Sequence, residues 1–306
     1  MTPDKALQNI INKIFSNAVM TEYAPIGAGF YGKVYAVKID KPPFKIAVKL
    51  FNAPNDNTRE LIWYTALQKS GIPLPAIFGA YSQGNVHALA MQLLSGRSAT
   101  NTRGLDKYSL DKLGEQIAHT AAQLHSFTGT GYGNIISNKD ICGGQHSSWI
   151  EYYKIKSLNI YNAITNGARQ RLLSNAQVSV FEKAVSLFSK IFYSEPNRPS
   201  LIHGDLNTDN IIINPDNAEL SAVIDPINSL WGDSEYELFQ FDCAAGKEYS
   251  LLQKYSAYRP LSNNYNIKSA FYAAFAEANH YCNISKAADD NLQQFINKLE
   301  NSLIEL

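Results

Sequence analysis

Charged and amide side chains interrupt two apolar runs in the segment LIHGDLNTDNIIIN, which spans residues 201–214. Phosphoryl transfer from ATP to a hydroxyl needs a carboxylate that orients the hydroxyl and accepts its proton, together with a metal ion near the phosphates. Asp205 is a candidate for this carboxylate, and Asn210 is a candidate amide ligand of Mg²⁺, which prefers oxygen ligands. The alternative is a polar turn between strands. The apolar flanks favour a catalytic loop, because a polar turn between two buried runs would be costly in free energy without a functional reason.

A glycine-rich segment, GAGFYGKV, places Gly27, Gly29, Gly32 and Val34 in a Gly-x-Gly-x-x-Gly-x-Val pattern. Glycines let the backbone turn tightly and approach phosphates closely. A dinucleotide-binding fingerprint would need a helix directly afterwards, but the strand-like KVYAVKI follows here. The pattern therefore predicts a hairpin over the phosphates, with a plain turn as the alternative.

Lys49 lies in the apolar, strand-like stretch KIAVKLF. Its ammonium could hold the α- and β-phosphates of a nucleotide, while a carboxylate on the following helix holds the ammonium. Glu60 is the best-placed carboxylate, and Asp56 is a weaker substitute. The alternative is a lysine whose head simply extends into solvent from the end of a strand.

A second acidic segment, LSAVIDPINSLWGDSEYELF, begins at residue 220. Asp225 follows an apolar, strand-like run and is a candidate second ligand of the metal. Asp233 could cap a helix that begins around Glu235. Asp233 and Glu235 are also candidates for contact with the substrate.

The order of these motifs resembles the protein-kinase-like fold: a glycine-rich loop, a strand lysine, a helix glutamate, HGDLNTDN and IDP. The sequence has His-Gly-Asp where protein kinases have His-Arg-Asp, and Asp-Pro where they have Asp-Phe-Gly. In both respects it resembles the aminoglycoside phosphotransferase and fructosamine kinase superfamily. The fructosamine kinase branch is the most similar, on the Leu-His, aromatic-Gly, Gln, Trp pattern of residues 124–158 and on IDPINSLWGDSEYEL. The resemblance covers nearly the full length.

The resemblance implies a role for each matching residue. Asp205 would be the catalytic base. Asn210 and Asp225 would bind Mg²⁺, and Lys49, paired with Glu60, would bind the phosphates of ATP.

The resemblance also implies a hinge that reads adenine through backbone groups, formed by Met91, Gln92, Leu93 and Leu94. His203 would orient the catalytic loop. The sequence departs from the family at two positions. Glu237 stands where the family usually has Asp, which puts the bracing of the catalytic loop in question, and Gln92 stands where a hinge Glu is common.

Two features favour a small-molecule acceptor over a protein. Gly204 replaces the arginine that would pair with an activation-loop phosphate, and only about ten residues separate Asp225 from the next expected helix. We therefore expect ATP-dependent phosphorylation of a hydroxyl on a sugar or sugar-amine adduct, as in fructosamine and ketosamine kinases. Trp149, Tyr152 and Trp231 would either line the substrate cleft or pack in the core.

Two alternatives to this function stay open at the level of the sequence. An aminoglycoside or other antibiotic O-phosphotransferase would use the same motifs on a polycationic acceptor. A catalytically inactive nucleotide-binding module is disfavoured, because a decayed site should have lost at least one of Lys49, Asp205, Asn210 and Asp225.

The expected elements give an α+β fold with two protein-kinase-like lobes. The N-lobe, residues 1–93, would hold a small β-sheet with strands in 33–39, 44–51, 77–81 and 86–91 and a main helix over about 58–70. The C-lobe, residues 94–306, would be larger and mainly helical, with one helix face along residues 110–124. The N-lobe carries nine basic and five acidic residues, and the C-lobe carries 18 and 22.

Composition excludes several other classes of protein. A chain of 306 residues with 45% hydrophobic and 18% charged residues can bury a sizeable core. Its 27 basic and 27 acidic residues leave no basic footprint for nucleic acid or an anionic membrane. Three widely spaced cysteines favour a reducing compartment over a disulfide framework, and the N-terminus has neither signal-peptide nor membrane-span character. We therefore expect a cytoplasmic enzyme whose partner is a small hydroxylated molecule.

Overall fold

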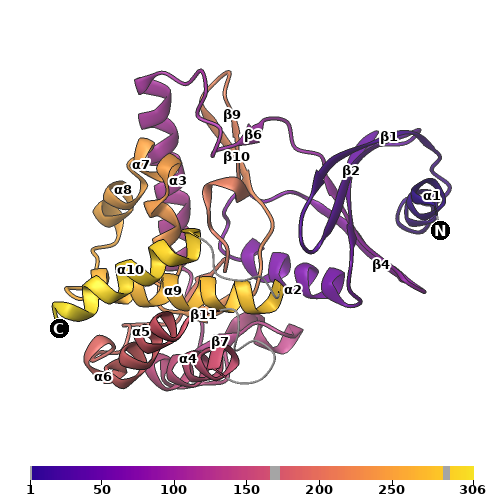
Figure 1. The fold of residues 1–306 in the computed structure, drawn as a ribbon. Coiled ribbons are helices and arrows are strands. Elements are labelled where there is room, and N and C mark those ends of the chain that lie inside the picture. The colour runs from indigo at the N-terminus through magenta and orange to yellow at the C-terminus, as the bar shows by residue number, and fades with distance from the viewer. Residues whose placement is uncertain (1, 166–172, 285–289) are drawn as a thin grey trace.

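The computed structural model describes residues 2–165, 173–284 and 290–306. An antiparallel sheet with two helices forms its N-terminal part, and helices dominate its C-terminal part (Figure 1). This arrangement confirms the predicted α+β fold class. Within the described residues, no helix is both long and apolar enough to cross a membrane.

The N-terminal sheet has five antiparallel strands in the order β1-β2-β3-β5-β4. Its strands and the two helices packed on it are α1 (Pro3–Ile14), β1 (Met20–Ala28), β2 (Gly32–Ile39), β3 (Lys45–Phe51), α2 (Asp56–Gln68), β4 (Ile77–Gln83) and β5 (Val86–Gln92). The predicted helix over 58–70 is therefore present, but it begins two residues earlier. Asp56 occupies its first turn, where a negative charge complements the helix dipole.

Strand β3 faces two different helices with alternate side chains. Ile46 and Val48 join the apolar cluster that includes α1, while Ala47 and Phe51 join the cluster that includes Tyr64 of α2. Successive side chains of a strand point to opposite faces. Lys49 therefore lies on the α2 face, which is why a lysine in an apolar strand meets the helix that carries Glu60.

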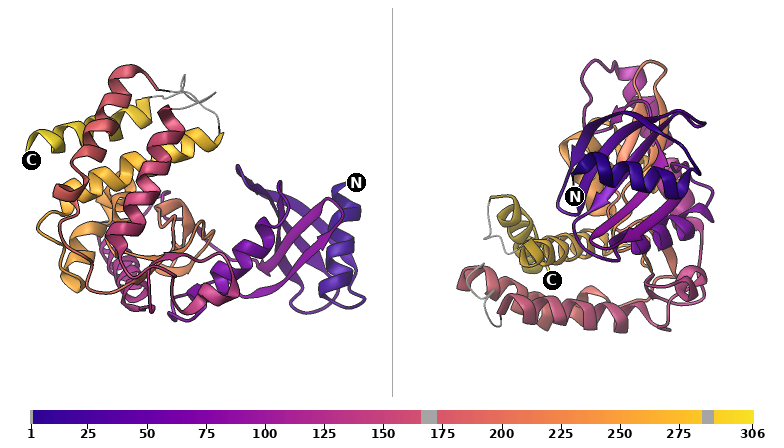
Figure 2. Two further views of the ribbon diagram at one scale, coloured as in Figure 1. Left: turned by 90° about the horizontal axis from the view of Figure 1, so that it is seen from below. Right: turned by 90° about the vertical axis from the view of Figure 1, so that its right-hand side faces the viewer.

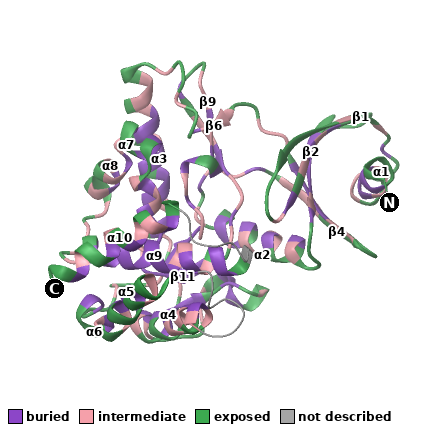
Figure 3. Cartoon of the chain, in the orientation of Figure 1, coloured by how far each residue is buried: buried purple, intermediate pink, exposed green. Residues whose placement is uncertain are grey.

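The C-terminal part is built mainly from helices (Figures 2 and 3). Its helices are α3 (Lys107–Ser126), η1 (Asn138–Cys142), α4 (Trp149–Thr165), α5 (Asn175–Ser186), α6 (Phe188–Ile191), η3 (Thr208–Asn210), η4 (Leu238–Asp242), α7 (Ala244–Glu248), α8 (Leu251–Tyr258), α9 (Tyr265–Ile284) and α10 (Asp290–Ile304). Helices α4 and α10 and the short helix η4 pack against α9, while α3 and α8 pack against each other. The predicted apolar face along residues 110–124 lies on α3, where Leu113, Ile117, Ala121 and Leu124 are buried.

The C-terminal part also contains two three-stranded sheets, with strand orders β10-β9-β6 and β7-β11-β8. Their strands are β6 (Arg97–Ser98), β7 (Gly133–Asn134), β8 (Ser200–Ile202), β9 (Ile211–Asn214), β10 (Glu219–Val223) and β11 (Leu230–Gly232). Strand β6 follows the N-terminal sheet by only a few residues and pairs with β9. This pairing anchors the connecting chain beside residues 203–210.

The aromatic core around α9 should dominate the stability of the C-terminal part. Phe271 is fully buried and stacks on Phe275 with a centroid separation of 4.1 Å. We expect Phe271→Ala to lower the free energy of unfolding by about 3–5 kcal/mol, because it leaves a cavity in a close-packed interior. Urea denaturation measures this change. Tyr108→Ala, at a side chain that is 75% exposed, should shift it by no more than about 0.5 kcal/mol, and an equal loss in the two variants would contradict the assignment.

Candidate active site

The polar segment at residues 203–210 connects two different sheets. Strand β8 enters it from the β7-β11-β8 sheet, and β9 leaves it in the β10-β9-β6 sheet. Within the segment, the Asn207 side chain accepts hydrogen bonds from the N–H groups of Asp209 (2.8 Å) and Asn210 (3.1 Å). Buried strands at both ends and local side-chain bonds in the middle hold this loop rigidly.

Asp205 is held by three amide donors. Its Oδ1 accepts from Asn207 Nδ2 and Gln240 Nε2, and its Oδ2 accepts from Asn210 Nδ2, each at 2.8 Å. Burial raises the pKa of Asp205, and the opposing effects of His203 and the three amides do not fully cancel that rise. The carboxylate is therefore fixed in orientation and more basic than a solvated aspartate, as a proton acceptor requires.

Glu237 holds the backbone of the loop at residues 203–210 in place. Its carboxylate accepts the backbone N–H groups of His203 (3.1 Å) and Gly204 (2.7 Å), and it also contacts His125 Nε2 at 3.0 Å. Burial alone would raise the pKa of Glu237, but the hydrogen bond and charge of His125, the charge of His203 and the backbone N–H of Gly204 lower it overall. The glutamate therefore supplies a carboxylate to the loop backbone, which removes the structural concern about its replacing Asp.

Gly204 adopts a backbone conformation that favours glycine. Its φ is +92°, and a Cβ built at this position would lie 1.9 Å from the carbonyl oxygen of Ile227. Neither an arginine nor any other side chain fits there without moving the backbone.

Lys49 lies between two carboxylates from different parts of the chain. Its Nζ is 2.6 Å from Glu60 Oε2 on α2 and is also hydrogen-bonded to Asp225 Oδ1, which follows β10. Asp56, the weaker candidate partner, instead contacts Arg59 at 3.4 Å. The structure thus brings together Lys49, Glu60 and Asp225, and it links the N-terminal sheet to the C-terminal part through one ammonium group.

Burial affects the two partners of this pair differently. It lowers the pKa of Lys49, but Glu60 and Asp225 outweigh it, so that the pKa is raised overall. Burial raises the pKa of Glu60 to about 7, against the lowering effect of Lys49. The pKa of Lys49 stays high because two carboxylates face its ammonium. The pKa of Glu60 rises because burial removes its hydration and only one cation, Lys49, compensates for that loss.

The first cavity at the site, here the Lys49 cavity, measures about 550 Å³ and lies between β2, β3, β5 and the β9–β10 region. Nine of the sequence-predicted residues line it: Gly27, Val34, Lys49, Glu60, Met91, Gln92, Leu93, Leu94 and Asp225. Gly29 and Gly32 shape the hairpin instead, since Gly29 N–H donates to Gly32 O at 2.9 Å. A Cβ at Gly32 would lie 2.0 Å from Leu50 O, so this glycine is required for the approach of β2 to β3.

The hinge residues differ in the backbone groups that they leave available. Gln92 N–H donates to Ala76 O at 2.8 Å, and Gln92 Oε1 accepts from Ala76 N at 3.2 Å. The backbone N–H and the side-chain oxygen of Gln92 thus both bond to Ala76, just before β4. Leu93 and Leu94 follow the end of β5 and also line the Lys49 cavity.

Asn210 and Asp225 lie on adjoining segments. Ile224 N–H donates to Asn210 O at 2.8 Å, and the next residue, Asp225, has a left-handed φ of +60° and donates its N–H to Tyr64 Oη at 3.0 Å. Among the described residues, no group of three or more His, Cys, Asp or Glu side chains could hold a metal ion. One carboxylate and one amide oxygen fit a Mg²⁺ ion whose other ligands are phosphate oxygens and water, and they do not fit an all-protein site.

The second cavity, here the Asp205 cavity, measures about 480 Å³. Asp205 and Gly204 line it, together with Tyr31 from the tip of the glycine-rich hairpin and Gln240. A smaller distal cavity of about 330 Å³ adjoins it and shares four lining residues with it, Asn134, Lys156, Ile160 and Asn279. The sequence analysis identified neither residue, because Tyr31 occupies a variable position of the glycine-rich segment and Gln240 lies outside the quoted motifs. Tertiary folding brings both to the cavity that Asp205 lines.

The two candidate substrate tryptophans lie in the core. Trp149 and Trp231 have no exposed surface, and their indole N–H groups donate to Tyr272 Oη (2.9 Å) and Asp140 O (2.7 Å). Of the three aromatic candidates, Tyr152 alone lines a cavity at the site, the distal one. Core packing, the second of the two expectations, therefore describes both tryptophans.

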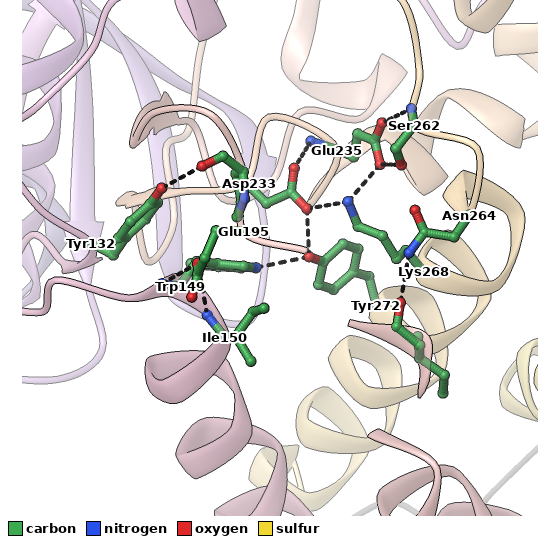
Figure 4. Close-up of polar contacts among 12 residues, drawn as sticks. Tyr132, Trp149, Ile150, Glu195, Asp233, Glu235, Ser262, Asn264, Lys268 and Tyr272 are labelled. Atoms are coloured by element: carbon green, nitrogen blue, oxygen red, sulfur yellow. Dashed lines mark hydrogen bonds and ion pairs between the residues drawn. The ribbon is translucent and has the colours of Figure 1, made fainter. Parts of the chain in front are cut away.

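Asp233 and Glu235 form a buried ionic cluster (Figure 4) and line a different cavity from the one that Asp205 lines. Lys268 Nζ lies 2.6 Å from Asp233 and 2.8 Å from Glu235, and Tyr272 Oη donates to Asp233 at 2.8 Å. Asp233 also accepts from Glu235 N at 3.0 Å, but it closes a turn, and the next helix, η4, begins only at Leu238. The expected helix at Glu235 is absent, and both carboxylates already have ion-pair and hydrogen-bond partners within the protein.

The conformation of Gly204 leads to a stability prediction. Gly204→Ala should lower the free energy of unfolding by about 1–3 kcal/mol or more, because it combines a left-handed backbone with a steric clash. Thermal or urea denaturation provides the measurement. The matched control is Gly29→Ala, where a Cβ would meet no atom within 4 Å and stability should be unchanged. Equal effects at both glycines would contradict the assignment.

The chain is similar in sequence to a known protein and in fold to several solved structures. The chain is 23% identical over 279 residues to the probable ketoamine kinase of Klebsiella aerogenes, covering 86% of this chain and 87% of that protein. It is similar in fold to the structure named "Putative fructosamine-3-kinase" of Haemophilus somnus, with a TM-score of 0.68, 15% identity, and coverage of 98% of this chain and 96% of that chain.

Structures of aminoglycoside phosphotransferases have a similar fold. One, a ternary complex with ADP and hygromycin B, has a TM-score of 0.70 at 12% identity, and the match covers 98% of each chain. Another, aminoglycoside 2′-phosphotransferase-IIIa in complex with GDP, has a TM-score of 0.71 at 15% identity and 99% coverage of each chain. Residues 22–241, most of the chain, match the Phosphotransferase enzyme family, and the protein therefore belongs to that family.

Proposed function

We propose that the protein transfers the γ-phosphoryl group of ATP to a hydroxyl of a ketosamine, a sugar-amine adduct. The observation that carries this proposal is that Asn210 connects the residues that line two cavities. Asp205 lines one cavity, Asp225 and Lys49 line the other, and Asn210 touches both Asp205 and the segment that leads to Asp225. A donor and an acceptor bound in these cavities would meet at Asp205.

In the proposed reaction, Asp205 orients the acceptor hydroxyl and takes its proton. The acceptor oxygen forms a bond to the γ-phosphorus, the bond from that phosphorus to the β,γ-bridging oxygen breaks, and ADP leaves with the bond electrons. Asn207, Asn210 and Gln240 fix the carboxylate for this transfer. The raised pKa of Asp205, which results from burial, supports its role as the base.

The nucleotide would occupy the Lys49 cavity. ADP and GDP in the aminoglycoside phosphotransferase structures support a purine nucleotide here, and Leu93 and Leu94 would read the base through backbone groups. Lys49 would contact the phosphates, while Asn210 and Asp225 would hold Mg²⁺. The ion would neutralise the charge that develops on the transferred group.

The ketoamine kinase relative supports a ketosamine acceptor. We also propose that the chain divides functionally near residue 94, with residues 1–93 holding the nucleotide and 94–306 holding the acceptor. The change from the five-stranded sheet to β6, which pairs inside the C-terminal part, supports this boundary.

Replacement of the proposed base tests the mechanism. Asp205→Asn should lower kcat for a ketosamine acceptor by about 10²–10⁴-fold, because the amide cannot accept the proton. Coupled ADP release measures this rate. Asp209→Asn, on the exposed side of the same loop, is the matched control and should retain activity. Turnover in the wild type no faster than in Asp205→Asn, with every acceptor tried, would support an inactive nucleotide-binding module instead.

An acceptor screen tests the substrate class. ADP release should be fastest with ketosamines and slower with aminoglycosides, amino sugars and simple alcohols. The complex of a structural neighbour with hygromycin B makes an antibiotic acceptor the second candidate. Preference for aminoglycosides over all ketosamines would favour that candidate and overturn the first.

The high pKa of Glu60 predicts a pH dependence of nucleotide binding. Glu60 becomes protonated as the pH falls through about 7, and the neutral acid no longer holds Lys49 as an ion pair. We therefore expect the KM for ATP to rise by roughly three- to tenfold from pH 8 to pH 6, as one of two charged contacts to Lys49 weakens.

Glu60→Gln should remove this dependence and show, already at pH 8, a KM close to that of the wild type at pH 6. Glu182→Gln, at an exposed position on α5, controls for the substitution itself. A wild-type KM that stays constant between pH 8 and pH 6 would refute the assignment.

A further inference from the structure

The distal cavity contains a lysine that no carboxylate neutralises. Lys156 lies on α4 at the junction of the Asp205 cavity and the distal cavity, and it lines both. Its Nζ is 3.1 Å from Tyr236 Oη and lies over the Tyr236 ring, 5.1 Å from the centroid. Among the residues that the structure describes, no carboxylate oxygen lies within 4.0 Å of this ammonium.

The other lysines withdrawn from water are paired differently. Lys49 and Lys268 are both buried, and each contacts two carboxylates. Lys156 is half-buried and has only a hydroxyl and an aromatic face as partners. Burial lowers the pKa of Lys156, but Tyr236 and Tyr152 outweigh it and raise the pKa overall, so the group is a cation at neutral pH. A partly desolvated cation without a counter-charge attracts an anion.

The surroundings of Lys156 favour an anionic ligand over a cationic one. In the described structure, amide, aromatic, imidazole and aliphatic side chains make up the rest of the distal cavity, and none is a carboxylate. The hydroxyl of Tyr152 donates to Asn134 Oδ1 at 2.8 Å, which orients two of these polar groups. The carboxylates of Asp205, Glu237 and Glu277 line only the Asp205 cavity. A polycationic acceptor would find no counter-charge at the distal end.

We propose that Lys156 binds a carboxylate carried by the amine half of the acceptor, so that the preferred substrates are ketosamines of amino acids with a free carboxylate. This inference rests on the proposed function. The sugar hydroxyl that receives the phosphoryl group would lie at Asp205, and the amine half would extend into the distal cavity. The two cavities, of about 480 and 330 Å³, are of the size that ligand pockets commonly have.

A pair of matched acceptors tests the charge requirement on the unaltered protein. One is the fructose adduct of an amino acid with its free carboxylate, and the other is the same adduct as the carboxamide. The acid should have a KM roughly ten- to a hundredfold lower than the amide, because a charge-assisted hydrogen bond to Lys156 is lost in the amide. The kcat values should agree within about twofold, because the carboxylate lies far from the reacting hydroxyl.

Variants at two neighbouring lysines locate the effect. Lys156→Met should raise the KM for the acid by roughly ten- to a hundredfold and leave the KM for the amide nearly unchanged. Lys156→Arg, which keeps the charge, should restore much of the preference. Lys154→Met, at an exposed position on the same helix outside both cavities, is the matched control and should behave like the wild type.

The outcomes separate this inference from the proposed function. If neither ketosamine is phosphorylated, the proposed function fails. If both are phosphorylated with equal KM, or if Lys156→Met raises the KM for acid and amide alike, the proposed function stands and the role of Lys156 is wrong. Comparing the two acceptors on the wild type gives this answer even if the Lys156 variants fail to fold.

Discussion

The geometry of the whole site depends on the buried carboxylate of Glu237. Glu237 accepts the backbone N–H groups of His203 and Gly204, which fixes the turn that carries Asp205. A buried carboxylate needs such donors, because an unpaired one would be strongly destabilising. The same hydrogen bonds that satisfy the Glu237 carboxylate therefore set the direction of Asp205. The amides of Asn207, Asn210 and Gln240 complete this positioning, so the loop holds its shape through its own contacts.

Lys49 adds a connection between the two parts of the chain. Its ammonium bonds to Glu60 within the N-terminal part and to Asp225 in the C-terminal part. The alternation of side chains along β3 directs Lys49 toward α2, and the left-handed turn at Asp225 directs that carboxylate toward Lys49. The alternation of β3 and the backbone conformation of Asp225 thus bring a carboxylate 176 residues away to the Lys49–Glu60 pair.

Local patterns in the sequence predicted four strands of the N-terminal sheet and two of the helices, and the family resemblance supplied the two-lobed fold. Alternation in KVYAVKI and KIAVKLF predicted the strands, and the helical period at residues 110–124 predicted α3. The tryptophans were harder, because an aromatic residue has the same local pattern in a core as on a cleft wall. Tyr31, Gln240 and Lys156 reach the cavities only through tertiary packing, which no local spacing encodes. Asp233 resembled a helix cap, yet a lysine 35 residues later in the sequence decides its contacts.

The position of Tyr31 would couple the two proposed binding events. Tyr31 lies at the tip of the glycine-rich hairpin, whose inner face lines the Lys49 cavity, and its side chain forms part of the wall of the Asp205 cavity. Any shift of the hairpin toward one ligand changes the surface offered to the other. By thermodynamic linkage, a donor that tightens acceptor binding by some factor has its own affinity raised by the same factor. The three residues between β1 and β2 would thus carry a coupling whose strength is the same for donor and for acceptor.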